Sequence, residues 1–174
     1  MSNTIAKVQT RVMLETSFGN ISIGLYDDQA PESVANFLQY VDEGFYDNTI
    51  FHRLVKNFVL QGGGYDVNGE EKITRAPVKN ESQNLLSNAK FTVAYARTMA
   101  PHSATSQFYI NLKDNAFLDY KEGASAGSGQ WGYTVFGEVL EGNDLVLETS
   151  NNTQTDRRDV PTSPLVILKA YRLN

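Results

Sequence analysis

The pattern that most constrains the fold is a series of short apolar segments, each of strand length and each separated from the next by a polar loop. In the clearest of them, Ile21, Ile23 and Leu25 alternate with small or polar residues, which is the period of a half-buried strand. Phe18-Gly19-Asn20 just before it is typical of a hairpin turn, with an earlier strand starting at Val12. The other segments of this kind are 49–54, 58–61, 92–96, 108–112, 134–139 and 165–171.

Two segments have helical character. Pro31 and Glu32 suit the first turn of a helix, because proline fits there and a carboxylate favours the positive end of the helix dipole. Apolar residues follow at helical spacing until Gly44, and a second helix is predicted over 144–149. Many short strands with only two helices predict a mainly β fold, a closed or nearly closed barrel.

Length and composition exclude several classes of protein. The 174 residues fit one domain, which we expect to cover 10–174 after a flexible polar leader over 1–9. The net charge of -5 argues against a nucleic-acid partner. There is no cysteine, and His52 and His102 lie far apart, so we expect no disulfide and no metal site, and we interpret His52 as structural.

No segment has the apolar length of a membrane span, and the first nine residues lack the apolar core of a signal peptide. We therefore expect a cytoplasmic protein with no membrane partner. The Gly/Ser-rich segment 123–129 has the composition of a linker, but core-like residues flank it on both sides. It is interpreted as a surface loop rather than a domain boundary.

Arg53 is the first candidate for a functional side chain. It stands among Phe51, Leu54 and Val55, and burying a guanidinium costs free energy unless the group is paired or used. Most arginines are solvated surface charges, and that alternative stays open. If Arg53 and Gln61 project from the same strand face, they point into one groove. Such a groove suits a neutral substrate that needs polarising, rather than one that needs a nucleophile.

Three consecutive glycines, Gly62 to Gly64, follow Gln61 and have two interpretations. A phosphate-binding loop needs a lysine and a hydroxyl after the glycines and a helix behind them, whereas Tyr65-Asp66 follows here. The simpler interpretation is a strand end at which the backbone comes close to another segment.

Three further places offer candidate groove residues. Gln107 and Tyr109 alternate along a predicted strand, which is either ordinary alternation or a placement of both side chains toward the groove. Phe117-Leu118 suggests core followed by a turn, and Tyr133 is suited to line a pocket with its hydroxyl outward. The spacing supports no Ser-His-Asp arrangement and no pair of catalytic carboxylates.

Taken in order, these motifs resemble the cyclophilin family of peptidyl-prolyl cis-trans isomerases, over roughly 12–171. The segments 96–98, 101–105 and 132–133 are most similar to its bacterial cytoplasmic branch. The resemblance implies an eight-stranded antiparallel closed β-barrel capped by two α-helices, with the substrate groove on its outside. The motifs that carry the resemblance are Phe51-His52-Arg53, Phe58-Val59-Leu60-Gln61-Gly62-Gly63-Gly64, Ser106-Gln107-Phe108-Tyr109-Ile110, Phe117-Leu118-Asp119 and Val135-Phe136-Gly137.

The resemblance also implies a reaction and a set of site residues. The reaction is rotation about X-Pro peptide bonds, which breaks no bond and needs no cofactor or metal, and Arg53 corresponds to the catalytic arginine. Expected partners are proline-containing peptides and unfolded protein clients, which the protein would bind as a monomer. The residues expected to bind substrate are Phe58, Val59, Tyr109, Phe117 and Leu118 in the proline pocket, Gln61 and Gln107 on the peptide backbone, Ala96 and Arg97 along the groove, and Tyr133 where many eukaryotic members carry histidine.

The chain departs from the family pattern at several positions. Val59 replaces the usual methionine, Tyr109 the usual phenylalanine, and Lys56-Asn57 the usual Pro-Gly. Phe117 replaces the tryptophan that the family associates with cyclosporin, so we expect cyclosporin-type ligands to bind weakly.

Two functions of other classes remain as alternatives. The same groove could serve a peptide-binding module or holdase chaperone, with isomerisation incidental. A barrel that binds a small apolar ligand inside is less favoured, because the strands offer bulky side chains that would fill the interior.

Overall fold

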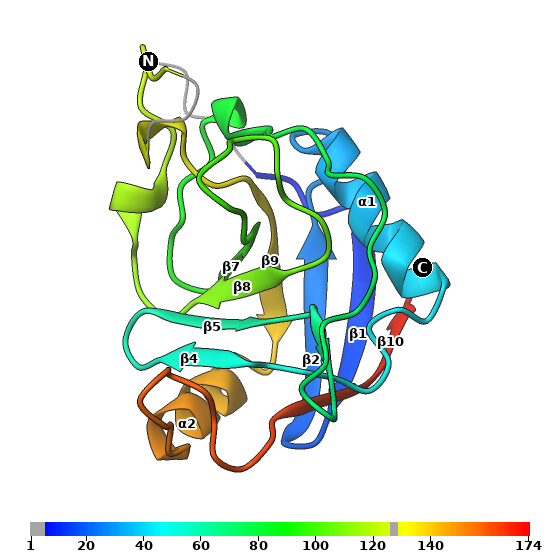
Figure 1. Cartoon of the computed structure of the whole chain (residues 1–174). Helices are drawn as coiled ribbons and strands as arrows, with labels where there is room; N and C mark the ends of the chain where they lie inside the picture. The colour runs from blue at the N-terminus through cyan, green and yellow to red at the C-terminus, as the bar shows by residue number, and fades with distance from the viewer. Residues whose placement is uncertain (1–5, 126–128) are drawn as a thin grey trace.

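The computed structural model describes residues 6–125 and 129–174. Its main feature is one curled antiparallel sheet of ten strands, ordered β4-β5-β8-β7-β9-β2-β1-β10-β3-β6 (Figure 1). The strands are β1 (Thr10–Thr16), β2 (Gly19–Leu25), β3 (Thr49–Ile50), β4 (Arg53–Val55), β5 (Val59–Gly62), β6 (Tyr65–Asp66), β7 (Thr92–Tyr95), β8 (Phe108–Asn111), β9 (Val135–Glu141) and β10 (Val166–Arg172).

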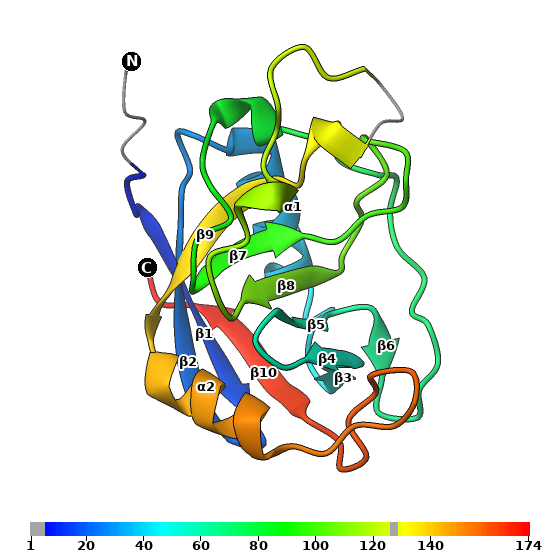
Figure 2. The same cartoon turned by 90° about the vertical axis from the view of Figure 1, so that its left-hand side faces the viewer.

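Helix α1 (Pro31–Asp42) and helix α2 (Asn143–Asn152) lie toward opposite ends of the sheet (Figure 2). Short 3₁₀ turns, η1 (Ser82–Asn84), η2 (Ala116–Leu118) and η3 (Gly129–Trp131), belong to the long loops. The predicted mainly β barrel with two helices is confirmed. The described residues form ten strands instead of eight, and no ladder joins β4 to β6 at the two ends of the strand order, so the sheet is a half-barrel.

The segment 49–54, predicted as one strand, is two strands. Among the residues described, β3 pairs with β10 and β6, whereas β4 pairs with β5 alone. The chain between them bonds elsewhere, because the Phe51 N–H donates to the Leu165 carbonyl at 2.8 Å. The break therefore depends on partners more than a hundred residues away, which no local pattern reports.

The predicted hairpin of the first two strands is confirmed. β1 and β2 pair in register from Thr10 opposite Leu25 to Thr16 opposite Gly19. The alternating residues of β2 face the interior, where Ile21, Ile23 and Leu25 are fully buried. Of the predicted leader, residues 1–5 lie outside the described residues, and the Gln9 N–H already bonds to the Leu25 carbonyl at 2.9 Å.

Helix α1 begins at Pro31 and takes its N-terminal cap from a distant loop. The Glu81 carboxylate accepts hydrogen bonds from the backbone N–H of Ser33 at 2.7 Å and of Glu32 at 3.3 Å. A carboxylate there satisfies free N–H groups and complements the helix dipole. Across the residues described, no helix is both long and apolar enough to span a membrane.

An aromatic cluster fills the space between α1 and the sheet. Phe37 of α1 lies with its ring centre 5.2 Å from Tyr46, 5.6 Å from Phe108 and 5.3 Å from Phe136. Phe108 belongs to this core, whereas the next residue on β8, Tyr109, belongs to a separate apolar cluster with Val59. Because neighbouring side chains of a strand point to opposite faces, β8 connects the core to the outer face on which the candidate site lies.

Candidate functional site

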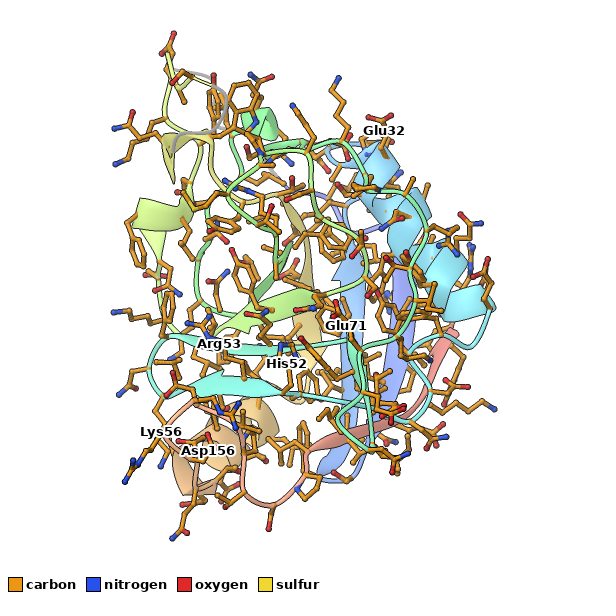
Figure 3. The ribbon with its side chains drawn as sticks, in the orientation of Figure 1. Glu32, His52, Arg53, Lys56, Glu71 and Asp156 are labelled. Carbon is orange, nitrogen blue, oxygen red and sulfur yellow. The ribbon has the colours of Figure 1, made fainter. Side chains whose placement is uncertain are left out.

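The site is organised around two side chains that face each other across a strand pair. Arg53 of β4 is the register partner of Gln61 of β5, and Arg53 Nη1 donates to Gln61 Oε1 over a long 3.4 Å. Gln61 Nε2 in turn donates to Gln107 Oε1 at 3.0 Å. Arg53 and Gln61 therefore lie on the same face of the strand pair, and both line the cavity described next. Figure 3 shows Arg53 beside His52 at this end of the sheet.

A cavity of about 220 Å³ opens next to Arg53. It is smaller than the pockets of about 300–1,000 Å³ that take drug-sized ligands, so it suits a small group such as one side-chain ring. Nine of the eleven residues predicted for the site meet around it. They are Arg53, Phe58, Val59, Gln61, Ala96, Arg97, Tyr109, Leu118 and Tyr133.

The two other predicted residues lie next to this cavity rather than on it. Phe117 is 60% exposed and stacks on Phe58, with ring centres 5.7 Å apart and planes at 18°. Gln107 lines an adjoining, more polar cavity, also of about 220 Å³. Four residues of long polar loops also line this second cavity and were not among the predicted site residues: Glu71, Thr98, Ser103 and Thr105.

Arg97 forms one wall of the first cavity, and its hydrogen-bond donors are already engaged. Its guanidinium carbon lies 4.4 Å from the centre of the Tyr133 ring. Nε and Nη2 donate to the Gly132 carbonyl at 3.1 and 2.9 Å, and Nη1 donates to the Thr98 carbonyl at 2.8 Å. Arg97 is therefore a structural cation that supports the Tyr133 ring.

Arg53 differs from Arg97 in the partners that its guanidinium has. Within the described part of the chain, the ion pairs are Arg75 with Glu43 and Arg172 with Asp42, and neither involves Arg53. Its one side-chain hydrogen bond, to Gln61, is long and weak. A half-buried guanidinium with its planar fork of donors unsaturated can donate to a group that enters the cavity.

His52 is packed as a structural residue. Its ring centre lies 4.5 Å from that of Tyr65, and its Nδ1 is buried without a hydrogen-bond partner in the segments described. Burial, with the charge of Arg53 as a second cause, lowers the pKa of His52 to about 4. The imidazole is therefore neutral at neutral pH and places no second charge beside Arg53.

The low pKa of His52 predicts a specific pH dependence of stability. An unfolded histidine binds a proton near pH 6.5, whereas folded His52 does so only near pH 4. Protonation therefore favours the unfolded chain increasingly as the pH falls through this window, and the free energy of unfolding should decline. Urea unfolding of the wild type and His52→Gln at pH 7, 6, 5 and 4.5 measures the difference. If the difference in the free energy of unfolding between the two proteins stays constant with pH, the lowered pKa of His52 is contradicted.

The glycines after Gln61 allow close approach, as predicted. A Cβ on Gly62 would lie 2.8 Å from the Ile50 carbonyl oxygen and 2.8 Å from the Phe51 ring. A Cβ on Gly64 would lie 2.5 Å from the side chain of Gln107, which lines the second cavity. Gly62 therefore needs glycine for space, whereas a larger residue at position 64 would displace the flexible Gln107 side chain. Throughout the described residues, no cluster of three or more His, Cys, Asp or Glu side chains could hold a metal ion.

Comparisons with known proteins match this chain over most of its length. Residues 11–172 match the family model described as cyclophilin type peptidyl-prolyl cis-trans isomerase/CLD. The chain is 48% identical over 162 residues to peptidyl-prolyl cis-trans isomerase cyp18 of Streptomyces antibioticus, covering 91% of this chain and 96% of that one. It is 47% identical over 160 residues to peptidyl-prolyl cis-trans isomerase B of Escherichia coli K12, covering 90% and 95%.

The fold is also that of solved cyclophilins. A crystal structure of a cyclophilin type peptidyl-prolyl cis-trans isomerase of Cryptosporidium parvum, in the presence of the dipeptide Ala-Pro, has a TM-score of 0.71. The match covers 95% of this chain and 99% of that chain at 24% identity, so it bears on the fold alone.

Proposed function

The chain belongs to the cyclophilin-type family of peptidyl-prolyl cis-trans isomerases, and we propose that Arg53 performs the catalysis while the cavity beside it holds the substrate proline. As a member of this family it is an isomerase (EC 5.2.1.8) that interconverts the cis and trans forms of X-Pro bonds. The single observation that supports this assignment of the site is the Arg53 guanidinium, which has one long hydrogen bond and no ion pair among the described residues, at the edge of a cavity with apolar side chains in its walls.

The reaction requires two things of the protein: a hydrogen-bond donor for the twisted bond, and a pocket that binds the proline. Rotation about a peptide bond is opposed by a barrier of about 18–20 kcal/mol, because the nitrogen shares its lone pair with the carbonyl. When the bond twists, that lone pair localises on the prolyl nitrogen and becomes a better hydrogen-bond acceptor. Arg53 donates to the nitrogen at that moment, which stabilises the twisted state more than either planar state.

The cavity and Gln61 bind the substrate on one side of the rotating bond. Val59, Leu118 and Tyr109 form apolar walls that hold the proline ring while the peptide on the other side of the bond turns. Gln61 lies between Arg53 and Gln107, where its amide can hold a peptide backbone group of the substrate. One side of the bond is thus fixed and the other is free, which is the arrangement that rotation requires.

The proposed substrates are proline-containing peptides and unfolded protein clients. The membership of the cyclophilin-type isomerase family supports this class, because the family acts on X-Pro bonds. In an NMR titration, an Ala-Pro peptide should shift the amide signals of Val59, Gln61 and Tyr109 and show cis-trans exchange that speeds up with enzyme concentration. The matched Ala-Ala peptide should do neither. Equal shifts with both peptides would contradict a proline pocket here.

The same titration separates the enzyme from a holdase that uses this groove. A holdase would bind proline-free segments as well and leave the exchange rate unchanged. The family assignment favours the isomerase.

Three narrower expectations remain proposals. We place the protein in the cytoplasm, on the similarity of 96–98 and 101–105 to the bacterial cytoplasmic branch, and we expect it to act as a monomer. We also expect weak binding of cyclosporin-type ligands, because the exposed Phe117 ring offers less surface than a tryptophan.

A further inference from the structure

We propose that Asn88 is a positioning residue for the proline pocket. It acts through the hydrogen bond that it accepts from the Tyr109 hydroxyl. The inference rests on the function proposed above for the cavity that Tyr109 lines. Asn88 does not line that cavity, and its side chain lies behind the wall, fully buried.

The Asn88 side chain is a hydrogen-bond hub. Its Oδ1 accepts from the Tyr109 hydroxyl at 2.7 Å and from Asn111 Nδ2 at 3.2 Å. Its Nδ2 donates to Asp119 Oδ1 at 3.0 Å and to the Tyr133 carbonyl at 3.4 Å. An amide has two acceptor sites and two donors, so these four partners use its whole capacity. No other side chain of similar size could satisfy all four.

The partners of Asn88 belong to separate walls of one cavity. Tyr109 is on β8, Tyr133 leads into β9, and Asp119 directly follows Leu118 of η2. Tyr109, Tyr133 and Leu118 all line the cavity. One buried amide thus connects three segments that are distant in sequence at the point where they surround the proposed proline ring.

The loop that carries Asn88 is itself fixed in place. The Asp119 carboxylate accepts from the Asn88 backbone N–H at 2.6 Å and from the Ser87 hydroxyl at 2.6 Å. Burial raises the pKa of Tyr109 well above its usual value, so its hydroxyl keeps the proton that it donates to Asn88. The Tyr109 hydroxyl therefore remains able to donate to Asn88 at neutral pH.

The role of such a hub follows from what the pocket does. The proline ring keeps its shape while the bond turns, so the pocket grips it equally in the ground states and in the twisted state. Interactions that are equal in both states set KM and leave kcat unchanged. Removing the Asn88 side chain should therefore weaken substrate binding and raise KM, whereas removing the Arg53 side chain should lower kcat.

The test is a double-mutant cycle on Asn88→Ala and Tyr109→Phe, with kcat and KM measured by NMR exchange on an Ala-Pro peptide. Losing one hydrogen bond of ordinary strength corresponds to a change of about two- to tenfold, so we expect KM to rise by that factor in Tyr109→Phe and by more in Asn88→Ala. Both variants should keep kcat within about twofold of wild type. In the double variant, Tyr109→Phe should add nothing to the effect of Asn88→Ala, because the hydrogen bond between the two side chains is already absent.

A destabilised control distinguishes positioning from a general loss of stability. Val146 of α2 is fully buried in the main core and does not line the cavity, so Val146→Ala should lower stability and leave KM unchanged. The proposal is overturned if Asn88→Ala has the same KM as Val146→Ala. It is also overturned if Tyr109→Phe raises KM by the same factor in the wild type and in Asn88→Ala. If Asn88→Ala fails to fold, an unchanged KM in Tyr109→Phe alone overturns it.

Arg53→Ala, run alongside, separates this proposal from the one on which it rests. An unchanged kcat there overturns the catalytic assignment of Arg53. An unchanged KM in the Asn88 and Tyr109 variants, with kcat lost in Arg53→Ala, overturns the positioning role alone.

Discussion

Arg53→Ala is expected to lower kcat for X-Pro isomerisation by about a hundredfold or more, which is the usual cost of removing a single donor that stabilises developing charge. Peptide affinity should change little, because the apolar walls of the cavity remain. The expectation follows from the state of the side chain, since Arg53 has one long hydrogen bond and no carboxylate partner in the described part of the chain. Most N–H donors of the Arg53 guanidinium are therefore available to the substrate and do not stabilise the fold.

Two further variants show whether the guanidinium itself matters. Arg53→Lys keeps the charge but loses the planar fork of donors, so it should recover only part of the lost rate. Arg157→Ala removes an exposed arginine and should leave the rate at wild-type level. Rates are followed by cis-to-trans conversion of a short X-Pro peptide. If Arg53→Ala matches the wild type, Arg53 is not the catalytic group, and if it loses peptide binding instead of kcat, its role is in the ground state.

The sequence predicted those features that local patterns encode. Alternation located the strands, as in Ile21, Ile23 and Leu25, because the two faces of a strand meet different surroundings. The Arg53 and Gln61 pair could also be predicted, because a tight β4–β5 hairpin makes them register partners. Both features depend on residues only a few positions apart.

What the sequence did not predict depends on distant partners. The break between β3 and β4 follows from bonds to the segment near Leu165. Gln107 reaches the second cavity because Gly64 leaves room beside it, and Phe117 stacks on Phe58 instead of lining the first cavity. Asn88 looked like an ordinary loop residue, since its four hydrogen-bond partners come from positions 21 to 45 residues away.

Phe108→Ala should cost about 3–5 kcal/mol in the free energy of unfolding, the typical cost of truncating a buried phenylalanine. Phe108 is fully buried, and its ring meets those of Phe37, Tyr46 and Phe51 edge-on, at centre distances of 5.6, 5.5 and 6.2 Å. These rings come from α1 and from separate loops, so no single element can move in to fill the space. The loss is a large part of the roughly 5–15 kcal/mol that stabilises a typical domain.

Urea unfolding monitored by circular dichroism measures this loss, with Phe108→Leu as the conservative variant and Leu168→Ala as the surface control. Phe108→Leu leaves a smaller void and should cost less, whereas Leu168 is 49% exposed and its truncation should cost within about 0.5 kcal/mol. Because Phe108 and Tyr109 point to opposite faces of β8, the folded fraction of Phe108→Ala should keep the kcat of wild type. A loss below about 1 kcal/mol would show that the core collapses around the void, contrary to the rigid aromatic packing on which the argument depends.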